Sequence, residues 1–416
     1  PVLSSLNRFA VMNIAILTNE YPPNVYGGAG VHVEYLTREM AALDDGAHQI
    51  DVYSFGEQRE EQGNLRVRGV QPIGEAPAAD ERHVKFLQTL QRDIVMAGLV
   101  EDADIVHGHT WYSHLGGCLV KQLAGAKLVL TTHSLEPHRP WKVEQLGTAY
   151  HGSSWIERTA YESADGVVAV SNAMRQDVSD LYDVDPERVR TIYNGIDLNQ
   201  YRPRPNEAVL RDHGVDPDQP IVLFVGRITR QKGILHLVNA LQEIQGGVQV
   251  VLLAGAPDTE EIAQEMTERV GRARETSDAE ITWIADMLPK DEVIAFYTHA
   301  SVFVCPSVYE PFGIINLEAM ACETPVVASA VGGIPEIVVP GETGLLVEFE
   351  AVGVGNADPA DPEQFAHDLA AHVNALLDDP QRRAQMAEAS RQRVEEVFSW
   401  TSIARQTLDF YASLLD

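Results

Sequence analysis

The sequence predicts an α/β protein made of two doubly wound, Rossmann-like domains that face each other across a cleft. Three observations lead to this prediction. At 416 residues the chain exceeds one ordinary core, so two domains of about 200 residues are expected. Short apolar runs alternate with helical patterns, which is typical of a parallel sheet covered on both faces. The alternation breaks off near residue 200 and then begins again.

In the first half, nearly all-apolar runs at residues 13–17, 127–131 and 166–170 predict buried strands. Residues 31–43 and 153–164 have the apolar spacing of helices that cover such a sheet. The second half repeats this pattern. Its predicted strands are residues 221–225, 248–253, 281–284, 302–304 and 325–328.

A proline-rich, charged stretch between the two halves predicts the domain boundary. We expect residues 1–203 to form an N-terminal Rossmann-like domain, in which 1–11 are an extension upstream of Met12. Residues 204–396 are expected to form a C-terminal Rossmann-like domain. Residues 397–416 are expected to form a helix that crosses back to the first domain.

The net charge of −30 argues against nucleic acid and against an anionic membrane as partners. No apolar run reaches the roughly 20 residues needed to span a bilayer. Cys118, Cys305 and Cys322 lie in apolar surroundings without paired spacing, which indicates reduced thiols of a cytoplasmic protein. A homodimer is left open.

The most informative segment runs from Ser307 to Glu318, directly after the apolar run that ends at residue 306. Glu310 on this loop can accept hydrogen bonds from sugar hydroxyls. Gly313 then opens a helix whose first N–H groups can hold a phosphate, and Glu318 on that helix can bind a ribose. One segment therefore offers contacts to every part of a nucleotide-sugar except the base.

Arg227 and Lys232 follow the first strand of the second domain, at the sheet edge where open α/β folds bind ligands. Both can bind phosphate oxygens, and a solvated loop is the alternative. The glycine turn at residues 331–336 comes after another predicted strand and lies at the same edge of the sheet. It is either a plain turn or a ligand contact. In the first domain, residues 27–30 are a glycine loop before a helix, either a tight turn or a ligand cradle.

Histidines cluster after two strands of the first domain, among them His107, His109 and His133. An imidazole at the end of a strand can bind a sugar hydroxyl, and a metal site is the competing interpretation. Because the spacing is irregular and no cysteine lies nearby, we expect no metal and no cofactor.

Together these motifs resemble the retaining glycosyltransferases of the GT-B fold, in the large group typified by family 4. Within it, residues 20–32 and 132–146 resemble the actinobacterial-type glycogen synthases, also described as α-maltose-1-phosphate synthases. The resemblance implies a metal-independent, retaining hexosyltransferase of glycogen biosynthesis. Its donor would be ADP-glucose, with UDP-glucose or another sugar as the alternative, and its acceptor a sugar phosphate or an α-1,4-glucan.

The resemblance also implies roles for matching residues. Glu310 would hold the hydroxyls of the donor glucose, and Arg227 and Lys232 would neutralise the diphosphate. Glu318 would bind the ribose, and His133 would touch the sugar or stabilise the transition state. The other expected binding residues are Gly27, Gly28, His109, Phe312, Gly313, Ile314 and Ile315.

The acceptor site is less defined. Arg139 and Lys142 either bind the phosphate of glucose-1-phosphate, or are solvated or pair with Glu136 and Glu144. Three tryptophans either stack on glucan rings or belong to the core, namely Trp111, Trp141 and Trp155.

Other classes of function remain as rivals. A GT-B nucleotide-sugar epimerase would share the donor site but would bind no acceptor. A non-catalytic carbohydrate-binding module would not need both glutamates and both cations. A dehydrogenase is disfavoured because Val33 occupies the third glycine position of the dinucleotide fingerprint.

Overall fold

The computed structural model describes residues 11–25, 27–353 and 356–416, which form two compact units. Unit 1 comprises the chain up to Asn194 together with Trp400–Asp416, and unit 2 comprises Gly195–Ser399. Residues 1–10 of the expected extension lie outside the described part, as does Tyr26 of the first glycine loop.

The chain passes from unit 1 into unit 2 at Gly195, which is earlier than the expected domain boundary between residues 203 and 204. The linker belongs to unit 2 because its backbone bonds there: Arg391 Nη1 donates to the Tyr201 carbonyl at 3.0 Å, and the Arg204 N–H donates to Thr298 at 3.0 Å. At the other end, residues 397–399 stay with unit 2, where Ser399 bridges to Ile196.

In the described part of unit 1, eight strands form one sheet in the order β3-β4-β2-β1-β5-β6-β7-β8. All neighbours are parallel except the antiparallel pair β3–β4 at the edge. The strands are β1 (Asn13–Thr18), β2 (Gln49–Phe55), β3 (Arg59–Gln62), β4 (Leu65–Val70), β5 (Ile105–His109), β6 (Lys127–Thr132), β7 (Gly166–Ala169) and β8 (Val189–Thr191).

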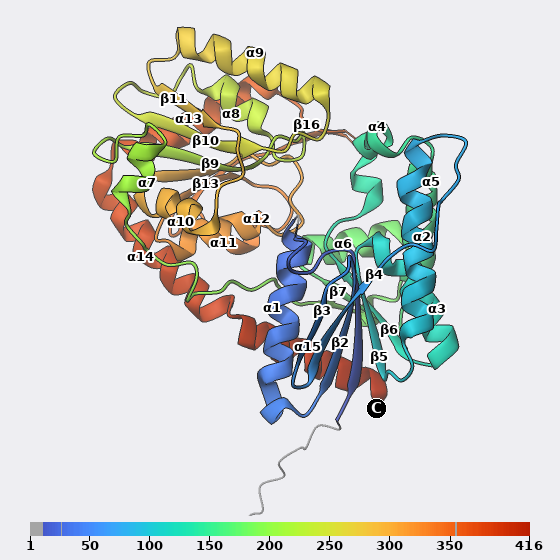
Figure 1. Ribbon diagram of the computed structural model, residues 1–416. Coiled ribbons are helices and arrows are strands. Elements are labelled where there is room, and N and C mark those ends of the chain that lie inside the picture. Colours follow the sequence, from blue (N-terminus) through green and yellow to red (C-terminus); the bar gives the residue numbers. More distant parts are fainter. Residues whose placement is uncertain (1–10, 26, 354–355) are drawn as a thin grey trace, which may run out of the picture. The chain divides into compact units, whose positions relative to one another are not determined.

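Helices cover both faces of this sheet. Helices α1 and α15 lie on one face, and α2, α3 and α5 lie on the other (Figure 1). The helices of unit 1 are α1 (Gly28–Ala42), α2 (Arg82–Leu99), α3 (His114–Ala124), α4 (Val143–Leu146), α5 (Ala149–Ser163), α6 (Asn172–Leu181) and α15 (Trp400–Leu415). The last helix of the chain therefore completes the core of the first unit.

In the described part of unit 2, six parallel strands follow the order β11-β10-β9-β12-β13-β14. They are β9 (Ile221–Arg227), β10 (Gln249–Gly255), β11 (Glu280–Ile284), β12 (Val302–Cys305), β13 (Val326–Ser329) and β14 (Gly344–Val347). A separate antiparallel hairpin consists of β15 (Ala351–Gly353) and β16 (Asn356–Pro359).

Helices α8, α9 and α13 cover one face of this second sheet, and α10, α11 and α12 cover the other (Figure 1). The helices of unit 2 are α7 (Glu207–Asp212), α8 (Ile234–Ala240), α9 (Glu260–Thr276), α10 (Lys290–His299), α11 (Ile314–Ala321), α12 (Ile334–Ile337), α13 (Pro362–Leu377) and α14 (Pro380–Val397). Two doubly wound, Rossmann-like units confirm the predicted α/β fold class.

Each predicted strand is present, with ends that shift by one or two residues. One expectation about β5 was wrong: His107 and His109 lie within this strand and not after it. A search for apolar runs does not assign these two residues to a strand, because they are polar. They are nevertheless buried in β5, where their imidazoles bond to other side chains. Within the described residues, no helix is both long and apolar enough to cross a membrane.

Candidate functional site

The predicted site residues fall into two groups, one in each unit. In unit 2 the central residue is Glu310, on the loop between β12 and α11. The residue as a whole is only 6% exposed. Glu310 Oε2 accepts a hydrogen bond from Lys232 Nζ at 2.6 Å and another from Ser307 Oγ at 3.1 Å. The structure thus brings Glu310 and Lys232 together, although 78 residues separate them in the chain.

Lys232 lies between β9 and α8, at the carboxyl end of β9. Burial disfavours its charge, but the Glu310 carboxylate outweighs this effect, so the pKa of Lys232 is raised. The ammonium therefore stays protonated at neutral pH, as binding of a phosphate by charge requires.

Arg227 is the last residue of β9, and its guanidinium is paired. Arg227 Nη1 donates to Asp258 Oδ1 at 2.8 Å. Asp258 follows β10, which is the strand next to β9 in the sheet. This partner of Arg227 was missed in the sequence, because the pairing depends on β10 lying beside β9 in the sheet.

Gly313 opens α11 with a φ of 110°, a conformation that favours glycine. A β-carbon at Gly313 would come within 2.7 Å of the Asn316 side chain and 3.3 Å of Glu310 Cγ. Phe312 is buried against Phe398, and Ile314 and Ile315 are half-buried in the first turn of α11. This turn therefore begins directly beside the Glu310 carboxylate.

Two polar residues of α11 differ in their contacts. Glu318 accepts a hydrogen bond from Tyr297 at 3.0 Å, and burial raises the pKa of this carboxyl group. The Asn316 amide is fully buried, and neither its nitrogen nor its oxygen has a partner among the described residues. Asn316 was missed in the sequence because its position predicts only a buried helix face.

In unit 1 the glycine loop precedes α1. The Gly27 N–H, expected to face a ligand, instead donates to Glu20 Oε2 at 2.7 Å. Gly28 begins α1 and is exposed. A β-carbon at Gly30 would come within 2.8 Å of the Glu20 side chain. The glycines thus let α1 approach Glu20, and Gly27 does not offer its N–H group as expected.

Histidines from three elements meet at the carboxyl ends of β5 and β6. His109 Nδ1 and His133 Nε2 lie 2.9 Å apart, and the His32 ring, on α1, is 4.8 Å from the His133 ring. His107 lies beside His109 and bonds to Tyr411 of α15 and to Thr131. Burial lowers the pKa of His32 to about 4 and that of His107 to about 3, so both rings are neutral at pH 7.

Three of these rings also offer nitrogen atoms within 4.8 Å of one another, namely those of His32, His109 and His133. Neutral imidazoles at this separation are ligands that a transition metal accepts. His109 Nδ1 already pairs with His133 Nε2, whereas His109 Nε2 and His32 Nε2 are buried with no partner among the described residues. No carboxylate or thiolate belongs to this group within the described residues.

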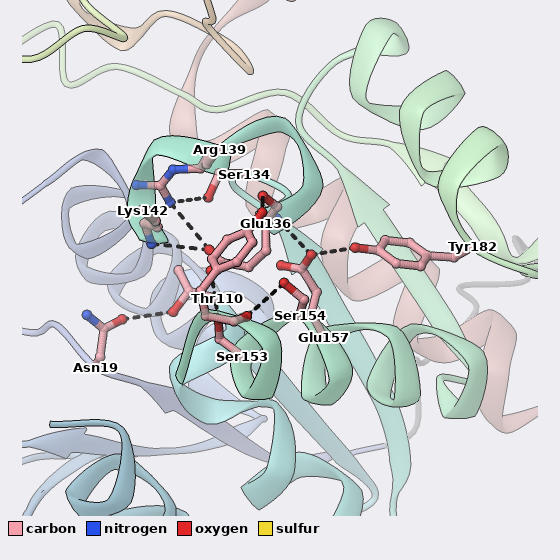
Figure 2. A network of polar contacts seen from close by, with 11 residues as sticks. Asn19, Thr110, Ser134, Glu136, Arg139, Lys142, Ser153, Ser154, Glu157 and Tyr182 are labelled. Atoms are coloured by element: carbon pink, nitrogen blue, oxygen red, sulfur yellow. Dashed lines mark hydrogen bonds and ion pairs between the residues drawn. The ribbon is translucent and has the colours of Figure 1, made fainter. Parts of the chain in front are cut away.

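The loop after β6 carries Arg139 and Lys142, and Figure 2 shows them beside Glu136. Lys142 Nζ donates to Glu136 Oε1 at 3.1 Å, and burial lowers the pKa of Lys142 to about 8. Arg139 Nη1 donates to Ser134 at 3.0 Å and is 3.9 Å from Glu136. Lys142 therefore pairs with Glu136, which is one of the expected alternatives. Arg139 forms a longer ion pair with Glu136, and its Nε is buried with no partner in the described part.

The other side of Glu136 faces a second buried carboxylate, Glu157 of α5 (Figure 2). The Glu136 N–H donates to Glu157 Oε1 at 2.8 Å, and Tyr182 also donates to this oxygen. Burial, reinforced by the charge of Glu136, raises the pKa of Glu157. A network of charged and polar side chains thus fixes the loop that carries Arg139.

Comparisons with known proteins agree with this geometry. Residues 26–200 match the family described as Glycosyltransferase Family 4, and residues 206–393 match Glycosyl transferases group 1. The chain is 48% identical over 404 residues to a protein of Mycolicibacterium smegmatis named alpha-maltose-1-phosphate synthase, covering 96% of this chain and 99% of that one. This chain is a family 4 glycosyltransferase.

A protein of Mycobacterium tuberculosis with the same name is 46% identical over the same length, covering 96% of this chain and 99% of its own. The structure of sucrose-phosphate synthase from Thermosynechococcus elongatus has a TM-score of 0.76 and 26% identity, covering 97% of this chain and 99% of that one. The resemblance inferred from the motifs and the GT-B fold are confirmed.

The tryptophans of this glycosyltransferase have different surroundings. Trp111 is buried and stacks on Tyr112 at 4.2 Å and on Phe86 at 5.9 Å, so it belongs to the core and offers no face to a glucan. Trp155 on α5 is 65% exposed. The Trp141 side chain lies outside the described part.

Proposed function

We propose that this glycosyltransferase moves glucose from ADP-glucose to glucose-1-phosphate with retention of configuration, which forms maltose-1-phosphate. The observation that carries the proposal is the 48% identity, over nearly the whole chain, to a protein named alpha-maltose-1-phosphate synthase. A product with two glucose residues and one phosphate requires a glucosyl donor and a glucose phosphate acceptor. An α-1,4-glucan is the alternative acceptor, and UDP-glucose is the alternative donor.

On the donor side, unit 2 supplies the groups that the reaction requires. Breaking the bond between the anomeric carbon and the diphosphate leaves negative charge on the diphosphate. Lys232, Arg227 and the first turn of α11 are groups that stabilise this charge in a fixed geometry. Glu310 is acceptor-only when ionised, so it suits the hydroxyl groups of the glucose.

The substitution is proposed to occur on one face of the sugar. The anomeric carbon loses its bond to the diphosphate oxygen and gains a bond to the acceptor hydroxyl oxygen. The proton of that hydroxyl passes to the departing diphosphate, so no side chain has to act as nucleophile or base.

On the acceptor side, we assign the phosphate of glucose-1-phosphate to Arg139 and not to Lys142. The Nε of Arg139 is buried and has no partner among the described residues, which supports this assignment because a guanidinium binds phosphate oxygens in a fork. Lys142 is only 6% exposed and neutralises Glu136. Its proposed task is to hold the loop in place.

The test is a turnover assay with ADP-glucose, in which glucose-1-phosphate and glycogen are offered as separate acceptors and UDP-glucose is the donor control. ADP release that requires glucose-1-phosphate, together with maltose-1-phosphate in the products, is the expected result. Turnover with glycogen alone would mean that the acceptor is a glucan and not glucose-1-phosphate. Faster turnover with UDP-glucose would mean that UDP-glucose, and not ADP-glucose, is the donor. Sugar isomerisation without any transfer would indicate an epimerase.

We also propose that the reaction needs no metal. Treatment with EDTA followed by desalting is expected to leave turnover within about twofold, because a protein cation already serves the diphosphate. Loss of activity that zinc or magnesium restores would overturn this proposal. If zinc restores it, the group formed by His32, His109 and His133 is the first place to look.

A further inference from the structure

We propose that Ser307 and Gly332 are positioning residues for glucosyl transfer, which act by fixing Glu310. This inference rests on the proposed function, in which Glu310 holds the donor sugar. Neither residue needs to touch the substrate. Ser307 donates a hydrogen bond to the carboxylate of Glu310, and the backbone of Gly332 lies directly against the Glu310 carbonyl.

The backbone of Glu310 is held by the turn after β13. The Gly333 N–H donates to the Glu310 carbonyl at 2.9 Å. Gly332, just before it, has a φ of +55°, and a β-carbon there would lie 2.0 Å from the Glu310 carbonyl oxygen. Any side chain at Gly332 must therefore push the Glu310 backbone away. The turn after β13 therefore packs directly against the backbone of Glu310.

The carboxylate of Glu310 is held by Ser307. Ser307 is fully buried, and its hydroxyl donates to Glu310 Oε2 at 3.1 Å. The Ser307 carbonyl in turn accepts a hydrogen bond from Ser329, the last residue of β13. The backbone that carries this hydroxyl is therefore held by the neighbouring strand.

A second glycine closes the loop from the other side. Gly233 has a φ of +63°, and a β-carbon there would lie 1.9 Å from the Pro306 carbonyl oxygen. The Val308 N–H donates to the Gln231 carbonyl at 3.0 Å. The segment from Pro306 to Glu310 is thus held between two glycine turns that follow β9 and β13.

This arrangement serves catalysis because Glu310 acts by position. A carboxylate that must meet particular sugar hydroxyls loses its effect when it moves, and a displacement of about 1 Å can cost roughly 100-fold in rate. The two turns leave the loop little room to make such a displacement.

The chain offers a matched control for each residue. Gly341 also has a positive φ, +81°, but a β-carbon there meets nothing within 4 Å. Ser390 is as buried as Ser307, and its hydroxyl donates to the Thr343 carbonyl at 3.0 Å. Gly332→Ala and Ser307→Ala are therefore compared with Gly341→Ala and Ser390→Ala, which carry the same change in the same unit.

We expect Gly332→Ala to lower kcat at least 30-fold, and Ser307→Ala at least 5-fold, relative to their controls. The Kd for ADP, which lacks the sugar, should stay within twofold in all four variants. A purely structural role predicts instead that activity falls only as the folded fraction falls, which thermal unfolding measures. Equal kcat for Gly332→Ala and Gly341→Ala overturns the proposal for Gly332, and equal kcat for the two serine variants overturns it for Ser307.

Glu310→Gln separates this inference from the proposed function. If Glu310→Gln retains full kcat, the role of Glu310 fails and the positioning role fails with it. If Glu310→Gln is inactive but Gly332→Ala matches its control, only the positioning inference fails. If the wild-type enzyme transfers no glucose, hydrogen exchange of residues 307–313 decides, since the loop must exchange faster in Gly332→Ala than in Gly341→Ala.

Discussion

Lys232 Nζ and Glu310 Oε2 lie 2.6 Å apart, and this ion pair joins the residue expected to bind the diphosphate to the residue expected to bind the sugar. Both side chains are largely buried. Each charge therefore depends on the other, and the two residues cannot be tested as independent parts.

Lys232→Met should destabilise unit 2 by about 3 kcal/mol, because it leaves the buried Glu310 carboxylate without its cation. It should also raise the KM for the nucleotide-sugar at least 10-fold. The double variant Lys232→Met/Glu310→Gln should regain most of the stability in urea unfolding but none of the activity. Lys85→Met, which removes an exposed lysine, is the control, and a double variant no more stable than Lys232→Met would contradict the pairing.

Glu310→Gln keeps the shape of the side chain and removes its charge. We expect kcat to fall by roughly 100-fold or more, the usual loss when a group that acts in the transition state is removed. Steady-state kinetics with saturating acceptor measure this loss. Glu342→Gln, an exposed glutamate of the same unit, should match the wild type, and an equal effect of both changes would remove Glu310 from the site.

Arg139→Ala should raise the KM for glucose-1-phosphate between about 10- and 100-fold, the value of one charged hydrogen bond. Activity toward a glucan without a phosphate should change little. Lys142→Met should act differently and lower the unfolding temperature, because Glu136 then lacks its cation. Arg190→Ala, at an exposed arginine of unit 1, is the control for charge alone. A KM unaffected by Arg139→Ala would move the phosphate site elsewhere.

The stability of unit 1 should fall as the pH falls below 6.5. Burial lowers the pKa of His32 to about 4 and that of His107 and His114 to about 3. The unfolded chain takes up these protons below pH 6.5 and the folded chain does not. Each histidine therefore removes about 1.4 kcal/mol of stability per pH unit down to its folded pKa.

His114 allows a direct check, because neither ring nitrogen has a partner among the described residues. The free energy of unfolding, measured in urea at several pH values, falls with a certain slope between pH 6.5 and 4.5. His114→Leu should reduce this slope by about the equivalent of one bound proton. His151→Leu, at an exposed position of α5, is the control for the loss of a histidine from the same unit. Equal slopes for the two variants would show that His114 titrates normally in the folded state.

The sequence was a good guide where a single segment carries both the structure and the chemistry. The run before Pro306 predicts a buried strand, and the glutamates that follow it indicate the family. It was a poor guide where a contact joins distant segments. The bond between Gly333 and Glu310 and the pairing of Arg227 with Asp258 depend on which strands become neighbours, and no local pattern shows this.

Residues with unusual burial were also difficult to predict. His107 in the middle of β5 and Glu157 on the inner face of α5 occupy positions where a pattern search expects apolar side chains. Both are accommodated because specific partners, Tyr411 and Tyr182, come from helices and loops far along the chain.

Because α15 belongs to unit 1, the two units are completed in a different order from the one in which their synthesis begins. Unit 2 is encoded as one continuous stretch and can fold once residue 399 has left the ribosome. Unit 1 begins first but finishes last, since Trp400, Leu408 and Tyr411 complete its core. Until then the sheet of unit 1 lacks α15, which together with α1 covers one of its faces. A nascent chain stopped at Ser399 would hold all of unit 2 and an unfinished unit 1.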